Sequence, residues 1–357
     1  MTGVRARGED IRRFILLNVE KNQHNINKIT AGHFKISRQA TNKHLQRLVE
    51  EKVLAETGKT RNRIYKLAPL VEWHQTYEIK PGLAEDVVWT NDIRLALGQL
   101  PDNVLNIWQH GFTEMFNNAL DHSDGSLIYV EMRKTATDTE MVLHDNGVGI
   151  FKKIQLALNL LDERHAVLEL AKGKLTTDPR NHTGEGIFFT SRIFDSFDIL
   201  AGGVYFRHLF GKLEDWILER DRFENGTSVW MKLHNHTART TRKIFDQYSS
   251  GDDYAFNKTV VPVNLAKYGD DNLISRSQAK RLLARVELFE VVVFDFTGVD
   301  TIGQAFADEI FRVFANQHPN IEITLIHANS QIKRMIERAK SGKVDEPSIP
   351  PDATPSV

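Results

Sequence analysis

Two short segments constrain this chain more than any others: residues 114–122, Glu-Met-Phe-Asn-Asn-Ala-Leu-Asp-His, and residues 145–150, Asp-Asn-Gly-Val-Gly-Ile. If the first segment is a helix, Glu114, Asn118 and His122 share one face, because they lie four residues apart. A carboxylate and an amide one turn apart can orient a water molecule or bind a hard cation through oxygen. The second segment combines an aspartate with two glycines, so its backbone can turn tightly and approach a flat ligand closely.

The residues between these segments predict a β-hairpin. Ser126–Arg133 alternates as a strand does, Thr135–Thr139 is polar turn material, and Glu140–His144 is a second strand. The chain is therefore expected to run from the helix through a hairpin into the glycine-containing loop.

Two further segments follow in order. Residues 182–194 contain a glycine pair that opens an apolar-periodic helix, and residues 225–233 read Asn-Gly-Thr followed by a strand. Together, the four motifs resemble the nucleotide-binding motifs of the GHKL ATPases, the superfamily of gyrase, heat-shock chaperone, histidine-kinase and mismatch-repair proteins. The resemblance covers about 120 residues. It implies a Bergerat α/β sandwich, in which helices cover one sheet, and it implies ATP and Mg²⁺ as ligands.

The resemblance also implies a role for each matching residue. Asn118 would ligate Mg²⁺ through its amide oxygen. Glu114 would be the general base that positions a water or hydroxyl for attack on the γ-phosphate. Asp145 would accept a hydrogen bond from the adenine amino group, and Thr227 would support the base beside it.

The glycines have roles of their own in this reading. Gly147 and Gly149 would let the backbone pass beneath the base, whereas Gly184 and Gly186 would line the phosphates. Residues 151–183 would form a lid over the nucleotide. The second glycine box lacks the fuller glycine run of many histidine kinases.

No helical hairpin with a phospho-accepting histidine precedes these motifs. His110 lies inside the helix that leads to Glu114 and is expected to be structural. Both features argue against a two-component sensor kinase.

Composition limits the class of protein. A length of 357 residues predicts two or three domains, and no apolar run approaches the roughly 20 residues of a membrane-spanning helix. The chain has no cysteine, which excludes disulfides and thiolate metal sites, and charged residues crowd the first 13 positions, unlike a signal peptide. We therefore expect a cytoplasmic protein that does not bind membranes.

The net charge of −1 hides an asymmetry. Residues 1–70 contain 15 Lys and Arg against 6 Asp and Glu, which leaves 31 against 41 in the remainder. A basic head on an acidic body indicates an anionic partner for the head alone.

The pattern of the head favours a DNA-binding domain. Helices are predicted over Glu9–Lys21, Asn27–Phe34 and Arg38–Glu51, followed by a strand, a basic turn and a strand over residues 53–67. This order resembles a winged helix-turn-helix, whose third helix enters the major groove of double-stranded DNA. The alternative is a winged helix that contacts only proteins.

The candidate DNA contacts are polar or basic residues of the third helix and of the wing. Arg38, Gln39 and Asn42 can pair with base edges, whereas Lys43 and Arg47 suit phosphates. The wing would add three cations to these contacts: Lys59, Arg61 and Arg63.

Residues 71–235 are assigned to the ATP-binding domain. A structured segment over Glu72–Lys80 and a helical stretch over Ala84–Leu100 precede Asp102, which is expected to cap the helix that carries Glu114. The last part predicts four short strands: 197–200, 203–209, 216–220 and 227–233.

Residues 236–340 predict a small domain of alternating strands and helices. Strands are expected over 259–265, 290–296 and 321–326, and helices over 275–286, 306–314 and 330–339. Residues 294–306 resemble the central loop of a STAS domain, the fold of anti-sigma-factor antagonists. In those proteins a phosphorylatable serine opens the following helix, but Gln304 stands here and Thr301 is out of register. Residues 341–357 are predicted to be a disordered tail.

The resulting hypothesis is a multidomain α/β protein, an ATP-binding regulator that hydrolyses ATP. ATP would couple a winged-helix head on DNA to a STAS-like module that meets a protein partner, in a chain that could form a homodimer. One alternative is an anti-sigma-type Ser/Thr kinase acting on a partner or on its own STAS-like domain. Another is a non-catalytic DNA-binding scaffold.

Overall fold

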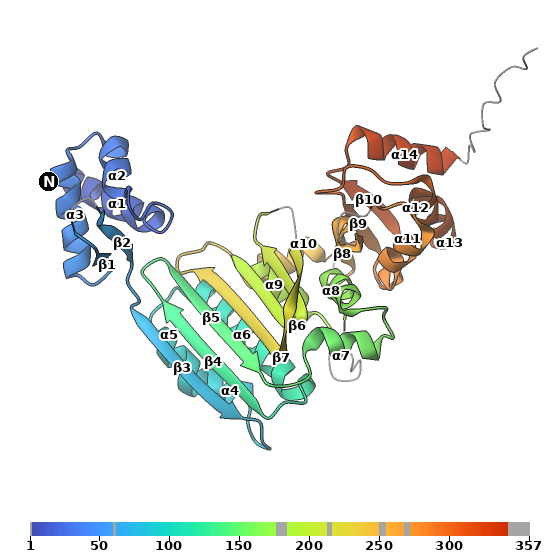
Figure 1. Ribbon diagram of the computed structural model, residues 1–357, viewed down its shortest axis with the longest axis horizontal. Coiled ribbons are helices and arrows are strands. Elements are labelled where there is room, and N and C mark those ends of the chain that lie inside the picture. The colour runs from blue at the N-terminus through green and yellow to red at the C-terminus, as the bar shows by residue number, and fades with distance from the viewer. Residues whose placement is uncertain are drawn as a thin grey trace, which may run out of the picture. The chain divides into compact units, whose positions relative to one another are not determined.

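The computed structural model describes residues 2–59, 62–175, 184–212, 216–249, 255–267 and 272–341. The chain divides after Gln247 into two compact units. Figure 1 shows the elements along the chain. The predicted tail, residues 342–357, lies outside the described residues.

Three helices and an antiparallel hairpin form the head. Their bounds are α1 Thr2–Asn18, α2 Ile26–Phe34, α3 Arg38–Glu50, β1 Leu54–Thr57 and β2 Ile64–Leu67. The Ser37 hydroxyl caps α3 by accepting a hydrogen bond from the Ala40 amide at 3.1 Å. The apolar stripes of the helices and hairpin meet in one core around Ile15, Leu45 and Tyr65. The predicted elements are present, although α1 begins earlier than expected.

A five-stranded antiparallel sheet is the centre of the first unit. Its order is β3 (Val71–Glu78), β4 (Leu127–Lys134), β5 (Asp138–Asp145), β7 (Trp216–His234) and β6 (Ser196–Leu209). The predicted hairpin is therefore β4–β5, and the segment predicted only to be structured is strand β3. Alternate residues of β5 are buried, which places one face of this strand in a core.

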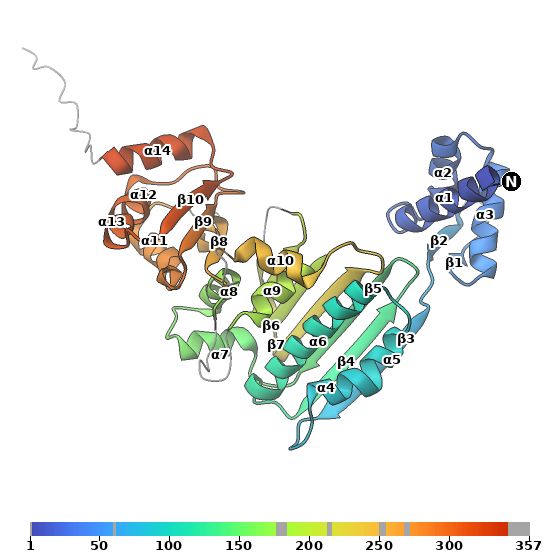
Figure 2. The same cartoon turned by 180° about the vertical axis from the view of Figure 1, so that it is seen from behind.

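The helix α6, Asp102–His122, lies across one face of the sheet beside α4 (Glu85–Val88) and α5 (Arg94–Leu97), as Figure 2 shows. Its large side chains Trp108, Phe112 and Phe116 are fully buried. Asp102 is the first residue of this helix and does not cap it, contrary to the prediction. The residue before it is Pro101, whose side chain cannot accept a hydrogen bond.

The prediction of four short strands after residue 196 is wrong, because the structure has two long strands. β6 contains 14 residues and β7 contains 19. Gly202 and Gly226 interrupt the apolar alternation, but both take positive φ angles, 57° and 83°, and the ladder continues past each of them. Glycine in this region marks a bulge rather than a strand end.

Four helices complete the first unit: α7 (Ile150–Ala157), α8 (Glu163–Lys172), α9 (Gly186–Ile193) and α10 (Thr241–Tyr248). α7 and α8 fall in the predicted lid, of which residues 176–183 lie outside the described part. The last helix, α10, reaches the boundary between the two units.

The second unit contains a parallel sheet in the order β10-β9-β8. Its strands are β8 Lys258–Pro262, β9 Val291–Asp295 and β10 Glu322–Ile326, and its principal helices are α11 Arg276–Leu283, α12 Gln304–Asp308 and α14 Ser330–Ser341. The predicted alternation of strand and helix is confirmed. The first strand ends at Pro262, earlier than predicted, and continues as a 3₁₀ turn over Val263–Ala266.

Candidate functional site

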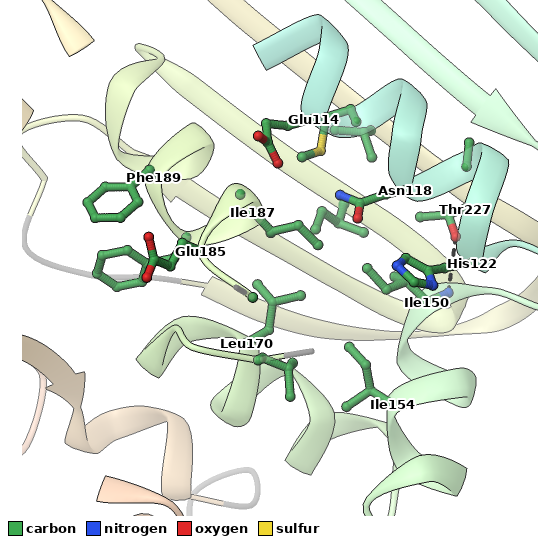
Figure 3. A pocket seen from close by; sticks show the side chains of 18 of the residues that line it. Glu114, Asn118, His122, Ile150, Ile154, Leu170, Glu185, Ile187, Phe189 and Thr227 are labelled. Carbon is green, nitrogen blue, oxygen red and sulfur yellow. Dashed lines mark hydrogen bonds between the residues drawn. The ribbon is translucent and has the colours of Figure 1, made fainter. Parts of the chain in front are cut away.

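A cavity of about 390 Å³ opens in the first unit beside α6. Its wall includes residues of α6, the end of β5, and helices α7 to α10. Figure 3 shows side chains from α6 facing Ile150, Ile154 and Leu170 across this space. Polar groups on one side and apolar groups on the other are typical of small-molecule sites.

One face of α6 supplies most of the polar wall. His110, Glu114, Asn118 and His122 follow one another at four-residue spacing, and all four line the cavity. The shared face that the sequence predicted is therefore present and carries one more member, His110. Trp108, Phe112 and Phe116 on another side of the helix are buried, which fixes the direction of this face.

Asp145 ends β5 and also lines the cavity, with 6% of its surface exposed. Its Oδ1 accepts hydrogen bonds from the Gly147 amide at 2.9 Å and the Thr227 amide at 3.2 Å. Burial raises the pKa of this carboxyl, and the hydrogen bonds from Gly147 and Thr227 oppose that shift. The Thr227 hydroxyl in turn accepts a hydrogen bond from the Ile150 amide at 3.0 Å, so one threonine connects β7 to both Asp145 and α7.

Gly147 and Gly149 do not line the cavity but shape the loop behind Asp145. A Cβ on Gly147 would overlap the Ser123 carbonyl at the end of α6. Gly149 precedes α7 with a φ of 93°, which favours glycine. The two glycines thus let this loop pass close to α6.

Gly184 and Gly186 also line the cavity, at the start of α9. Gly184 has a φ of 73°, and a Cβ there would come within 2.5 Å of the Leu175 carbonyl carbon. Gly186 is the first residue of α9, and a Cβ there would overlap the Glu114 carboxylate. Glu114 therefore lies against the N-terminus of α9, where partial positive charge favours anions.

Two buried polar atoms in the cavity wall have no hydrogen-bond partner in the described part of the chain. They are Asn118 Nδ2 and His110 Nε2. Buried polar groups in native proteins are nearly always satisfied, so each such atom indicates a ligand or water beside it. Burial also lowers the pKa of His110, which favours its neutral form.

The described residues contain no group of three histidine, aspartate or glutamate side chains that could hold a metal ion. Asn118 could therefore contribute only one protein oxygen to a cation, and a ligand with phosphate oxygens would have to supply others.

Sequence reasoning missed three residues of this site. Glu185 lines the cavity between the two glycines, and burial raises its pKa. Phe189 and Phe245 form an aromatic wall, with ring centroids 4.0 Å apart. The position of Glu185 between two glycines was a usable signal, whereas nothing in the sequence connects Phe245 to residues more than 50 positions earlier.

The candidate DNA-contacting residues of α3 differ in solvent exposure and in ion pairing. Arg38, Gln39 and Lys43 of α3 are exposed, whereas Asn42 is half-buried. Arg47 is exposed but its Nε lies 3.0 Å from Glu51.

The three cations predicted for the β1–β2 hairpin also differ in their exposure and pairing. Lys59 is exposed, and Arg61 lies outside the described residues. Arg63 pairs with Glu56 at 3.2 Å, so its charge is already partly compensated.

In the second unit, polar side chains gather where the parallel strands β9 and β10 end. Asp295 Oδ1 accepts hydrogen bonds from the Thr297 amide and hydroxyl at 3.0 and 2.7 Å, and it lies 2.9 Å from His327 Nδ1. Gln304 begins α12 and is exposed, and Thr301 precedes it in the loop.

Comparison with known proteins identifies part of this unit. A family model described as "STAS-like domain of unknown function (DUF4325)" matches residues 278–333. The C-terminal domain is STAS-like, as its central loop predicted. A search of curated proteins finds no match. No helix within the described ranges is both long and apolar enough to cross a bilayer.

Asp145 makes a testable contribution to stability. Because its pKa is raised above the ordinary value of 3.8, the protonated form favours folding, and this contribution is lost as pH rises through the raised pKa. Asp145→Asn keeps an oxygen acceptor and cannot titrate. The free energy of unfolding of the wild type, minus that of the variant, should fall by about 1.4 kcal/mol per unit of pKa shift as pH rises from about 4 to 7. Urea titrations across this range would contradict the account if the difference stayed constant or rose.

Proposed function

We propose that this protein is an ATP-binding regulator whose first unit contains a GHKL-type nucleotide site. The observation that carries the proposal is that six of the eight residues predicted from separated motifs line one cavity, and the other two shape its loop. The six are Glu114, Asn118, Asp145, Gly184, Gly186 and Thr227. Unrelated surface residues from four motifs would not be expected to converge in this way.

Asp145 is proposed to recognise the adenine amino group. Its carboxylate is held by two backbone amides, so it is fixed before any ligand arrives. A preorganised acceptor loses less free energy on binding than one that must be ordered first. The Thr227 hydroxyl fixes the first turn of α7 by accepting a hydrogen bond from the Ile150 amide.

The phosphates are proposed to lie between Asn118 and the N-terminus of α9. The helix end offers backbone amides to anions, and Gly186 lets the Glu114 carboxylate approach that end closely. Mg²⁺ would be held by the Asn118 side chain together with the phosphates, and it would neutralise negative charge there. The unpaired Asn118 Nδ2 could donate a hydrogen bond to a phosphate oxygen, while the Oδ1 of the same amide would hold Mg²⁺.

Glu114 is proposed to be the general base for hydrolysis. It lies one turn from Asn118 on the same face of α6, and its carboxylate lies against the N-terminus of α9. Glu185 is another carboxylate among the described lining residues that could compete for this role, since burial raises its pKa. The two can be distinguished by substitution.

The head is proposed to be a winged helix-turn-helix that binds double-stranded DNA. Support comes from the capped α3, its exposed Arg38, Gln39 and Lys43, and the positive charge of residues 1–70. ATP binding would alter the affinity of this head for DNA and of the STAS-like domain for a protein partner.

Phosphotransfer within the chain is not part of the proposal. Gln304 opens α12 and has no hydroxyl group. The chemistry proposed is therefore transfer of the γ-phosphoryl group to water, with ADP and phosphate as products.

Glu114→Gln should keep ATP binding and lower the rate of phosphate release by about 100-fold or more, because general-base catalysis contributes 10²–10⁴-fold. The matched control is Glu185→Gln, which removes the other carboxylate and should retain turnover. Phosphate release would be measured at saturating ATP and Mg²⁺, with and without DNA. Full turnover in Glu114→Gln, or its loss only in Glu185→Gln, would contradict the assignment of the base.

Replacing Arg38 and Lys43 together by alanine should weaken DNA binding and reduce the slope of log K against log salt by about 0.9, for the phosphate contact assigned to Lys43. The control, Arg13→Ala with Lys21→Ala, removes equal charge from outside α3 and the hairpin. Fluorescence anisotropy with duplex DNA at several salt concentrations measures the affinity and its salt dependence for each variant. Equal losses in the two double variants would contradict the recognition-helix interpretation.

A further inference from the structure

Part of the cavity is lined by an aromatic wall that the predicted nucleotide-binding residues do not include. Phe189 of α9, Phe245 of α10 and His110 of α6 line it together. The Phe245 ring lies 4.0 Å from the Phe189 ring and meets the His110 ring edge-on at 5.8 Å. Three helices therefore meet at this wall through one phenylalanine.

The helix that supplies Phe245 has an unusual place in the chain. α10 is the last helix of the first unit, and the chain enters the second unit at Tyr248, the final residue of the same helix. Within the second unit, Tyr248 packs edge-on against Phe256, and Phe256 contacts Phe289 in the same manner. Phe256 and Phe289 are both buried. Phe245 thus lines the cavity of the first unit, whereas Tyr248 belongs by its contacts to the second unit.

Much of the α10 surface is exposed. Ile244 is its one buried residue, at 3% exposure, and Arg242, Lys243, Asp246 and Gln247 are exposed. A short helix with so few buried contacts is easily loosened or tightened. Its order should therefore depend strongly on the contacts of Phe245.

The partner of Phe245 belongs to the segment that would bind phosphates. Phe189 lies one turn after Gly186 on α9, and Gly186 contacts Glu114. A ligand that fixes the start of α9 fixes Phe189 with it, because α9 is only eight residues long. Burial keeps His110 largely neutral, so the third member of the wall adds an uncharged face to Phe245.

We infer that Phe245 is the positioning residue through which occupancy of the cavity by a nucleotide orders α10, the connection to the STAS-like domain. This inference rests on the proposed nucleotide site and adds the residue that transmits its occupancy. A bound nucleotide stabilises the aromatic wall, and α10 becomes more ordered.

Hydrogen–deuterium exchange of the full chain, followed in peptides covering residues 241–248, tests the inference with Mg-ADP as the probe. Wild-type α10 should exchange roughly tenfold more slowly when ADP is bound, equivalent to about 1.4 kcal/mol of added local stability. In Phe245→Ala this protection should disappear while ADP still binds, as measured by calorimetry. Phe245→Leu, which retains apolar bulk and with it the fold, should reduce the protection without abolishing it.

Ile244→Ala is the matched control, because Ile244 anchors the same helix but does not line the cavity. It should speed exchange in both states and leave the ADP-dependent difference intact. Protection of α10 that persists in Phe245→Ala, or that is absent from a wild-type chain shown to bind ADP, would overturn the inference. Failure of the wild type to bind ADP in calorimetry would instead overturn the proposed nucleotide site, and this inference with it.

Discussion

The packing of α6 is the constraint on which the rest of the first unit depends. Trp108, Phe112 and Phe116 fix one side of the helix toward the sheet, which leaves His110, Glu114, Asn118 and His122 no direction but the cavity. The end of the helix also sets the path of the next loop, since Gly147 passes too close to the Ser123 carbonyl to carry a side chain. Asp145 is placed by that loop and by β7, so the core and the site are positioned by the same contacts.

Much of this arrangement could be predicted because it depends on local periodicity. The four-residue spacing on α6 and the alternation of β4 and β5 each follow from a few neighbouring residues. The β6–β7 hairpin could not be predicted correctly. Gly202 and Gly226 have the appearance of strand ends, and only pairing with a distant strand shows that the ladder continues past them. The STAS-like domain could also be predicted from local periodicity, since its strands and helices alternate over short stretches of sequence.

One part of the site escaped prediction because it is made by contacts between distant segments. Phe245 reaches Phe189 and His110 only because α10 folds back onto α6 and α9. Glu185 is recognisable as a site residue once its burial is known, because a carboxylate with a raised pKa in a cavity is a candidate for proton transfer. Phe245 has no periodicity that a sequence pattern could reveal, whereas the glycines on either side of Glu185 were a usable signal. Both adjoin the predicted phosphate region and bear directly on how the site could act on the rest of the chain.

The central claim is that the cavity beside Asp145 binds an adenine nucleotide. Calorimetric titration of the full chain with ATP and, separately, with GTP tests it most directly in the presence of Mg²⁺. The account predicts one site per chain that binds ATP at least about tenfold more tightly than GTP, since a guanine carbonyl cannot donate to a carboxylate and one lost charge-assisted hydrogen bond costs about 1.5–3 kcal/mol. Equal affinity for the two nucleotides would contradict the role of Asp145. No binding of either would contradict the nucleotide site itself.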